Sequence, residues 1–244
     1  MRAVVITPTT GIPELAQAIQ SVANQGDQVQ HWVVIDGMQY ADKAIKIVQE
    51  NVHNNLKLII LPENTGMPAN YFKELDEGFY GHRIYAGIAN FINAECVLFL
   101  DEDNWYEPNH VSTMVEGLKN YNLEWIYSLR RVVDKDGNFL CEDNCDSLGV
   151  YPNQNRITFV DMNCYCFRTE FLLNMLDAFQ VPSYNCDREV FKRAIALSPK
   201  PDSFSSTGRY TVNYRANREE HKDWFFNGNE KMKQIYNTFP WRIE

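Results

Sequence analysis

The stretch CVLFLDEDN, residues 96–104, decides the fold. It is an apolar run that ends abruptly in three acidic residues, Asp101, Glu102 and Asp103. Adjacent carboxylates repel one another unless water screens them or a positive group lies between them. The sequence therefore leaves two interpretations of the cluster open: it is the solvated end of a buried strand, or it holds a cation.

Three earlier runs are similarly apolar: AVVIT (3–7), HWVVID (31–36) and LKLIIL (56–61). Short apolar runs rich in β-branched residues are typical of strands that are buried on both faces. Between the runs, apolar residues recur at the spacing of an amphipathic helix. Four buried strands separated by helices predict an α/β fold, with a Rossmann-like, mostly parallel sheet and helices on both faces.

After Asp103 the pattern becomes mixed. The elements expected there are helices near 108–120, 169–179 and 187–197, strands at 124–133, 157–160 and 165–167, and a tight turn at Asp136-Gly137. From Ser198 the sequence predicts a loop that leads to a helix around 217–236. We expect one domain with two halves, 1–104 and 105–200, followed by a C-terminal tail or lid, 201–244.

The composition excludes several classes of protein. Of the 244 residues, 45% are hydrophobic and 23% are charged, which is ordinary for a globular domain. The net charge of -9 and the lack of a basic run argue against nucleic-acid binding. No apolar stretch approaches the roughly 20 residues that span a bilayer, so no transmembrane segment is expected. The six cysteines lack the usual zinc spacing, which favours reduced structural thiols and a cytoplasmic location.

Polar residues follow each of the four predicted strands. They are Thr7-Pro8-Thr9-Thr10, Asp36-Gly37, Asn64-Thr65-Gly66 and Asp101-Glu102-Asp103. In open α/β sheets ligands bind beyond the carboxyl ends of the strands, so these residues are expected to line one crevice. Strand ends are also polar simply because loops are, but four such ends on one edge favour a binding site.

The Asp-x-Asp pattern alone fits several chemistries. A calcium loop of the EF-hand type fails, because Trp105 and Tyr106 stand where an oxygen ligand and a glycine are needed. A haloacid-dehalogenase-type phosphotransferase would use Asp101 as its nucleophile, but its motif normally ends the first strand and not the fourth. A dinucleotide dehydrogenase is disfavoured because no G-x-G-x-x-G follows the first strand.

Five segments in a fixed order carry a family resemblance: VVITPTTG, HWVVIDG, LPENTG, GHRIYAGIAN and VLFLDEDN. Their order and spacing resemble the GT-A glycosyltransferases, specifically the inverting family 2. The resemblance covers roughly residues 2–110 and returns at MNCYCFRTEFL and CDREVF. It implies transfer of a sugar from a nucleotide-diphosphate sugar, with a UDP-sugar favoured, to a glycan or other hydroxyl acceptor. A non-catalytic domain that binds nucleotide-sugar or glycan stays as the alternative.

The resemblance also implies roles for single residues on the donor side. Thr7, Pro8, Thr9 and Asp36 would surround the base and ribose; Asn64, Gly66 and Arg83 would line the nucleotide; Asp101 would contact the ribose or a metal-bound water; and Asp103 would bind Mn²⁺ or Mg²⁺. A divalent ion between two carboxylates and a diphosphate would remove the repulsion within the acidic cluster. Asp101 and His221 are further candidate metal ligands. Residues 67–80 form an insertion relative to the family pattern, and Asn104 replaces a family aspartate.

An inverting transferase needs a base for the acceptor hydroxyl, and the family places this carboxylate at a helix start. Asp187 in CDREVF occupies that position, with Asp161 as the second candidate. From the residues alone, Asp187 is equally suited to be a helix N-cap. His221 is either a metal or diphosphate ligand from a C-terminal lid or a solvent-facing residue of an amphipathic helix.

Overall fold

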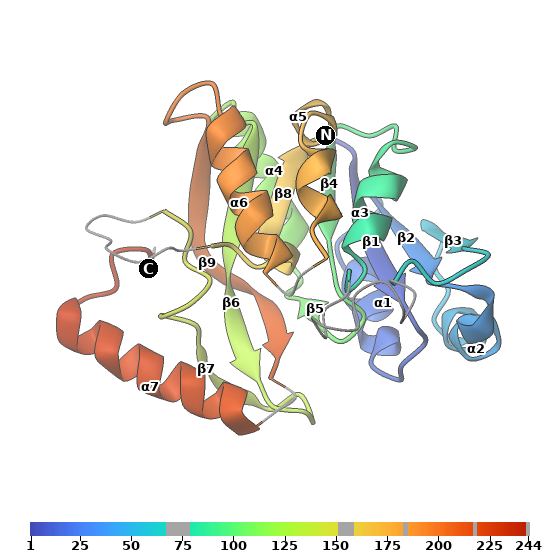
Figure 1. Ribbon diagram of the computed structural model, residues 1–244, viewed down its shortest axis with the longest axis horizontal. Coiled ribbons are helices and arrows are strands. Elements are labelled where there is room, and N and C mark those ends of the chain that lie inside the picture. The colour runs from blue at the N-terminus through green and yellow to red at the C-terminus, as the bar shows by residue number, and fades with distance from the viewer. Residues whose placement is uncertain (67–78, 151–158, 183–184, 217–218, 243–244) are drawn as a thin grey trace.

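The structure is a computed structural model that describes residues 1–66, 79–150, 159–182, 185–216 and 219–242. Its strands pair in the order β3-β2-β1-β4-β8-β6-β9-β5, and β7 pairs with β6 (Figure 1). Strands from the two halves of the chain thus share a continuous sheet, joined where β4 meets β8.

The first half is the parallel part of the sheet. It consists of β1 (Ala3–Thr9), β2 (Val29–Ile35), β3 (Leu56–Ile60) and β4 (Cys96–Phe99), connected through α1 (Leu15–Ala23), the turn η1 (Met38–Tyr40), α2 (Ala41–Glu50) and α3 (His82–Ala89). Each neighbouring pair among these strands is parallel. The predicted parallel sheet is confirmed, although β3 lies at the edge and is only partly buried rather than covered on both faces.

The second half adds antiparallel pairs. Its strands are β5 (Trp105–Tyr106), β6 (Trp125–Val133), β7 (Phe139–Glu142), β8 (Tyr165–Arg168) and β9 (Phe204–Arg215). Its helices and turns are α4 (His110–Asn120), η2 (Met162–Cys164), α5 (Thr169–Leu173), η3 (Leu176–Gln180), α6 (Cys186–Leu197) and α7 (Glu219–Ile235). β8 runs antiparallel to both β4 and β6, whereas β6 and β9 are parallel.

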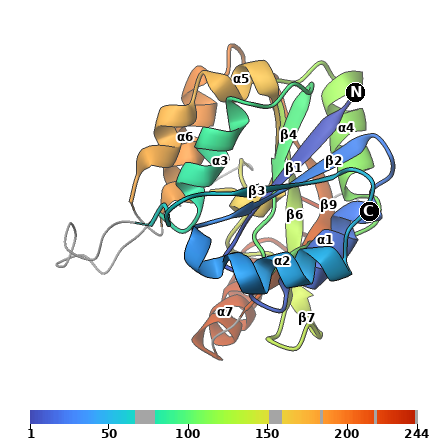
Figure 2. The same cartoon turned by 90° about the vertical axis from the view of Figure 1, so that its right-hand side faces the viewer.

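Helices cover both faces of the sheet, as the sequence predicted. Figure 2 shows α3, α5 and α6 on one side and α1 and α4 on the other. On the first side, the ring of Phe99 at the end of β4 lies 4.7 Å from Tyr85 of α3 and 5.6 Å from Phe179 of η3, between ring centroids. This packing fixes α3 beside the end of β4. α7 lies apart, along β7 (Figure 1).

One central strand was not predicted. The segment expected to be a loop after Ser198 contains β9, which lies between β6 and β5. Its polar side chains are buried because they have polar partners: Thr211 Oγ1 lies 2.8 Å from His110 Nδ1, and Asn213 Nδ2 donates to Glu107 Oε1 at 2.9 Å. The region 201–244 therefore includes part of the sheet as well as the predicted C-terminal helix, so it is not a detachable lid as a whole.

Two smaller predictions also need correction. The helix expected at 169–179 is a short α5 followed by the separate turn η3. Phe159 and Val160 are buried but belong to no strand, and the rest of the strand expected at 157–160 lies outside the described residues. The hairpin at Asp136-Gly137 is confirmed, because β6 and β7 pair around it.

A buried ion cluster holds the second half together beneath the sheet edge. Arg130 of β6 forms ion pairs with three carboxylates: Asp143 at 2.9 Å, Asp146 at 2.8 Å and Asp161. The Arg130 side chain is 3% exposed, and its guanidinium lies 4.2 Å from the centre of the Tyr214 ring. A buried guanidinium is stable only when it is paired with negative groups. Arg130 therefore holds the three carboxylates, and the segments that carry them, close together.

All six cysteines are free. Within the described residues, none of the helices combines the length and the apolar character that crossing a membrane would require.

Candidate functional site

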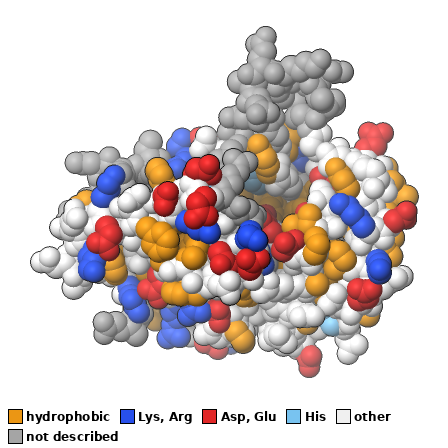
Figure 3. Space-filling model, turned by 90° about the horizontal axis from the view of Figure 1, so that it is seen from below, with side chains coloured by type: hydrophobic (Ala, Val, Ile, Leu, Met, Phe, Trp, Pro, Cys, Tyr) orange, Lys and Arg blue, Asp and Glu red, His pale blue; other side chains and the backbone are white. Residues whose placement is uncertain are grey.

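The carboxyl ends of β1, β2, β3 and β4 meet at the edge that faces down in Figure 1. Figure 3 shows this face from below, with acidic side chains near a hollow at its centre. Most of the residues that the sequence singled out come from the loops at this edge, and they fall into three groups around β4, β2 and α6.

Glu102, the middle residue of the acidic cluster, is not a ligand candidate but a clamp for the loop after β1. Its carboxylate accepts hydrogen bonds from Thr9 Oγ1 at 2.5 Å and Thr10 Oγ1 at 2.9 Å. It also accepts from the backbone N–H groups of Thr10, Gly11 and Ile12 at 3.0–3.2 Å. Five donors stabilise the charge of Glu102. The repulsion expected within the acidic cluster therefore concerns mainly Asp101 and Asp103.

Asp101 is held by two side-chain donors. Its Oδ1 accepts from the Tyr85 hydroxyl and its Oδ2 from Asn163 Nδ2, both at 2.7 Å, while its own N–H donates to Asn163 Oδ1 at 2.6 Å. Burial raises the pKa of Asp101 to about 7, and the charges of Asp103 and Asp161 act in the same direction. Asp101 is therefore firmly oriented. With a pKa of about 7, its protonated and ionised forms are about equally populated near neutral pH in the absence of a cation.

Asp103 is half-buried and is anchored through its backbone. Its carbonyl oxygen accepts from Arg215 Nε at 3.0 Å, and the N–H of Arg215 donates to Asn104 Oδ1 at 2.9 Å. Asn104, which replaces the family aspartate, is thus buried and bonded to the end of β9. Its amide oxygen serves the fold rather than a ligand.

A second group lies where β2 and β3 end. Asp36 Oδ2 accepts from Asn64 Nδ2 at 2.8 Å, and its Oδ1 accepts from the N–H of Thr65 at 2.7 Å. Asn64 Oδ1 in turn accepts from the N–H of Gly66 at 2.8 Å. The predicted nucleotide residues Asp36, Asn64 and Gly66 are therefore brought together. An open hollow of about 360 Å³ adjoins them, lined by Leu61, Pro62, Glu63, Asn64, Thr65 and Arg83.

The residues that end β1 are more deeply placed than the sequence suggested. Thr7 is fully buried, with its hydroxyl 2.9 Å from His31 Nε2, and Thr9 is buried with its hydroxyl on Glu102. Pro8 is half-buried, and a Cβ on Gly81 would come within 3.2 Å of its ring. Of the three, Pro8 is the one with side-chain surface to offer a ligand.

The start of α3 lies between the loop of Asn64 and the first turn of α6. Arg83 is exposed; it donates from Nη1 to the carbonyl of Thr65 at 3.4 Å and lies over the Phe79 ring at 4.9 Å. Its neighbour His82 points to the other side, with Nε2 3.7 Å from Asp187 Oδ1. Arg83 thus lies beside the loop that contains Asn64, and its role toward a nucleotide stays a prediction. The insertion at 67–80 lies almost entirely outside the described residues.

Asp187 lies in the first turn of α6, where the sequence expected a base or a cap. Its Oδ2 accepts from the N–H of Met162 at 3.3 Å, on another element, and α6 has no side-chain cap at Asn185. Burial raises the pKa of Asp187 well above its usual range, and the charges of Asp161 and Asp101 raise it further. Asp187 is therefore not the N-cap of α6, and its role as a base stays a prediction.

Asp161, the second candidate base, is buried, and both of its carboxylate oxygens already accept hydrogen bonds. Its Oδ1 accepts from the N–H of Asn163 at 2.9 Å and from Asn163 Nδ2 at 2.8 Å, and its Oδ2 bonds to Arg130. The N–H of Asp161 donates to Ser147 Oγ at 2.8 Å, which fixes its backbone. It is suited to orient its neighbours.

Two residues of the site were missed in the sequence. No role was predicted from the sequence for His82 or for Asn163. Burial lowers the pKa of His82 to about 4, against the opposing charge of Asp161, so the imidazole beside Asp187 is neutral at neutral pH. Asn163 donates to both Asp101 and Asp161. Polar residues inside apolar segments, GHRIYAGIAN and DMNCYCF, are the signal that could have found them.

His221 lies in the first turn of α7 and is half-buried. Its role as a metal or diphosphate ligand stays a prediction. In the part of the chain that the structure describes, no three carboxylate, imidazole or thiol side chains are grouped closely enough to hold a metal by themselves.

Comparisons with known proteins bear on the fold. No protein-family model matches the chain, and no curated protein matches it. Among solved structures, it is similar to S. aureus TarS 1–349 in complex with UDP-GlcNAc, with 16% identity, a TM-score of 0.63, and coverage of 96% of this chain and 66% of that one. TarS 1–349 in complex with UDP matches at 14% identity with a TM-score of 0.64, covering 97% and 72%.

The chain therefore spans about two thirds of the TarS 1–349 structures, and it covers 44% of S. aureus TarS in the longer crystal structure, at a TM-score of 0.61. At these identities the likeness concerns the fold. It confirms the GT-A-like architecture that the sequence predicted: an α/β sheet whose parallel half presents its carboxyl edge, completed by a mixed half.

The geometry of Asp101 predicts a pH-dependent loss of stability. Its pKa is higher in the folded chain than in the unfolded one, so the folded state holds the extra proton between about pH 4 and 7. The free energy of unfolding should consequently fall as the pH rises through this window. In Asp101→Asn, an amide that can bond both Tyr85 and Asn163 replaces the carboxyl. This variant should be more stable than wild type at pH 8 by on the order of 1–3 kcal/mol and equal to it at pH 4.

Chemical denaturation at pH 4, 6 and 8 in EDTA measures the effect. Asp136→Asn is the control, because Asp136 lies in the exposed β6–β7 turn and should change little at any pH. A stability difference between Asp101→Asn and wild type that is the same at all three pH values would contradict the account.

Proposed function

We propose that the protein is a metal-dependent glycosyltransferase that moves a sugar from a nucleotide-diphosphate sugar, with a UDP-sugar favoured, to a hydroxyl acceptor with inversion. The observation that carries the proposal is the grouping of Asp101, Asp103 and Asp187 at the carboxyl edge of a GT-A-like sheet. Structures of the same fold have been solved with UDP and with UDP-GlcNAc bound.

The donor would occupy the edge formed by the ends of β1, β2 and β4. Asp36 is buried at the end of β2 and is fixed by the loop that contains Asn64, so it is suited to orient a base or ribose by accepting hydrogen bonds. The exposed guanidinium of Arg83 beside this loop supplies a positive charge toward the phosphates.

The donor set of the acidic cluster fits a divalent cation that is shared with a diphosphate. Asp101 is already bonded to Tyr85 and Asn163, which makes Asp103 the main protein ligand, with His221 as a candidate addition. Mg²⁺ with nucleotides is usually held by one or two carboxylates plus phosphate oxygens and water, so a site without three protein ligands is the expected kind. When bound, Mn²⁺ or Mg²⁺ would stabilise the negative charge of the leaving diphosphate.

Asp187 is the proposed general base. Burial and the nearby charges of Asp161 and Asp101 raise the pKa of Asp187, and a carboxylate with a raised pKa is a stronger proton acceptor than an ordinary aspartate. The N–H of Met162 donates to its Oδ2 at 3.3 Å, and the imidazole of His82 lies near its Oδ1, at 3.7 Å. As the acceptor oxygen attacks the anomeric carbon and the bond to the diphosphate breaks, Asp187 would take the hydroxyl proton.

The rival functions are less well supported. A phosphotransferase would need Asp101 as a nucleophile, yet both of its oxygens accept hydrogen bonds and its raised pKa weakens it at neutral pH. A non-catalytic binding domain would not need a partly buried carboxyl such as Asp187 to be oriented beside other aspartates. Turnover measurements separate these alternatives.

The metal assignment predicts the behaviour of Asp103→Ala. With a panel of UDP-, GDP- and dTDP-sugars and Mn²⁺, wild type should hydrolyse at least one donor slowly. Asp103→Ala should lose this activity by about 10²-fold or more, because it lacks the ligand that holds the charge-stabilising ion. Its fold should be intact by circular dichroism, since Asp103 is anchored through its backbone.

Asp136→Ala is the matched control, as a carboxylate in an exposed turn outside the site. Equal donor hydrolysis by Asp103→Ala and Asp136→Ala would exclude Asp103 as a metal ligand. Absence of hydrolysis of every donor by wild type would favour the non-catalytic alternative.

The base assignment predicts different outcomes for two aspartates. Asp187→Asn keeps the size of the side chain but cannot accept a proton, so transfer should slow by roughly 10²-fold or more with donor affinity near normal. Asp161→Asn should mainly lower stability, because it weakens a buried pair with Arg130. NMR of the product should show an inverted anomeric centre. Normal turnover by Asp187→Asn together with a slow but stably folded Asp161→Asn would move the base to Asp161.

A further inference from the structure

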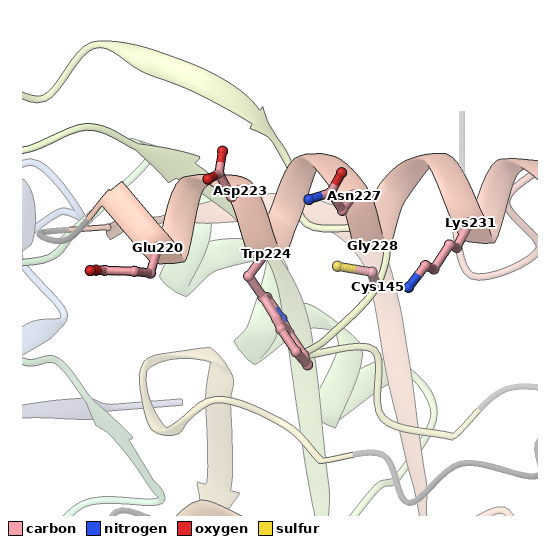
Figure 4. Close-up of a pocket in the computed structure, with 7 residues that line it drawn as sticks. All are labelled: Cys145, Glu220, Asp223, Trp224, Asn227, Gly228 and Lys231. Atoms are coloured by element: carbon pink, nitrogen blue, oxygen red, sulfur yellow. The ribbon is translucent and has the colours of Figure 1, made fainter.

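A second pocket lies on α7, away from the strand ends. Figure 4 shows its lining: Cys145 from the loop after β7, and residues of α7 that include Glu220, Asp223, Trp224, Asn227 and Lys231. These α7 positions recur every three or four residues and so share one face of the helix. The pocket has a volume of about 310 Å³.

Gly228 allows the wall of this pocket to form. A Cβ at this position would lie 2.4 Å from Cys145 Sγ, so any side chain would push the loop away from the helix. Cys145 Sγ also contacts the carbonyl of Phe225 at 3.9 Å. The helix and the loop are thus packed closely at one end of the pocket, next to the exposed indole of Trp224.

The chemistry of the lining suits a neutral sugar. Trp224 is 59% exposed and offers an aromatic face, on which the apolar C–H face of a pyranose can pack. Around it, Glu220 and Asp223 accept hydrogen bonds, Lys231 donates, and Asn227 does both, which matches hydroxyl groups that donate and accept. Two acids against one lysine disfavour an anionic ligand such as a nucleotide. The volume is near the lower end of the range for small-molecule pockets.

A short series of contacts connects the pocket to the proposed catalytic edge. Phe225, next to Trp224, is buried, and its ring centre lies 5.3 Å from the guanidinium of Arg130. Arg130 binds Asp161, and Asn163 donates to both Asp161 and Asp101. The loop of Cys145 is held by the same arginine, which pairs with Asp143 and Asp146 on either side of it. The pocket therefore lies between α7 and the 105–200 half of the chain.

We propose that this pocket is a subsite for one neutral pyranose unit of a glycan acceptor. The acceptor role rests on the proposed function and adds to it a class of acceptor, a glycan longer than one sugar, and a place where its distal unit binds. The binding of a sugar at Trp224 does not depend on turnover, so it can be measured separately.

Saturation-transfer NMR on the full chain tests the proposal, with the methyl pyranosides of glucose, galactose, mannose and N-acetylglucosamine as probes. At least one glycoside should receive saturation from wild type, and the signal should fall at least about fivefold in Trp224→Ala and also fall in Asn227→Ala. Phe226→Ala is the control, since Phe226 is exposed on the same helix but does not line the pocket. Excess UDP with Mn²⁺ should leave the signal in place.

Three results would overturn the proposal: no glycoside signal with wild type, an equal signal in Trp224→Ala, or loss of the signal on adding UDP, which would assign the sugar to the donor edge. Self-association that disappears in Trp224→Ala without any glycoside signal would assign the face to contact between copies instead. Glycoside binding by a wild type that hydrolyses no donor would refute the acceptor role together with the proposed function, while the sugar site itself would stand.

Discussion

Four aspartates share one edge of the sheet, and keeping their charges there is the constraint on which the rest of the site depends. They are Asp101, Asp103, Asp161 and Asp187. Mutual repulsion and burial together raise the pKa of Asp101 and of Asp187. Without compensation such a group would push the edge apart or remain protonated. The surrounding structure supplies the compensation residue by residue, and each aspartate receives a different kind.

Asp161 is neutralised by the buried guanidinium of Arg130 and so forms the fixed part of the group. Asp101 receives two neutral donors, which orient it without removing its raised pKa. Among the described residues, Asp187 accepts from a backbone N–H and lies near a neutral imidazole. The three carboxyls thus differ in how far their charge is compensated. Asp161 and Asp101, which have more partners, are suited to positioning, whereas Asp187, which has fewer, is the group proposed to accept a proton.

The same contacts tie the halves of the chain to one another. β4 ends in the acidic cluster and pairs with β8, so the η2 turn that carries Asn163 is placed directly beside Asp101. Arg215 at the end of β9 bonds the backbone of Asp103 and thereby connects the cluster to the segment that leads into α7. Ligands that lie between the acidic cluster and Asp187 of α6 would touch both halves, as a transfer between two bound substrates would require.

The sequence predicted the parallel half of the fold well, because buried parallel strands are written as continuous apolar runs. It could not reveal β9, in which Thr211, Asn213 and Arg215 are buried against polar partners that come from distant parts of the chain. The candidate site shows the same limit. Asp187 was found by a family pattern, whereas the helper His82 depends on the packing of α3 beside α6 and has no local signature.

Glu102 gives a second example of this limit. In the sequence it is indistinguishable from its acidic neighbours. Only the path of the loop after β1 shows that its carboxylate accepts hydrogen bonds from backbone N–H groups. The sequence left two interpretations of the acidic cluster open, a solvated strand end or a cation site. The structure shows that the three acids differ: Glu102 bonds the loop after β1, and Asp101 is oriented by Tyr85 and Asn163. Asp103 is the residue that we propose binds the ion.

The central claim is that a divalent cation shared between Asp103 and a diphosphate balances this acidic edge. Crystals of the chain grown with UDP and Mn²⁺ test it most directly, through the anomalous scattering of manganese. The account predicts one manganese peak about 2.0–2.5 Å from a carboxylate oxygen of Asp103 and from diphosphate oxygens, with the nucleoside lying toward Asp36. UDP bound at this edge with no manganese at Asp103, or manganese and UDP bound elsewhere, would contradict the account.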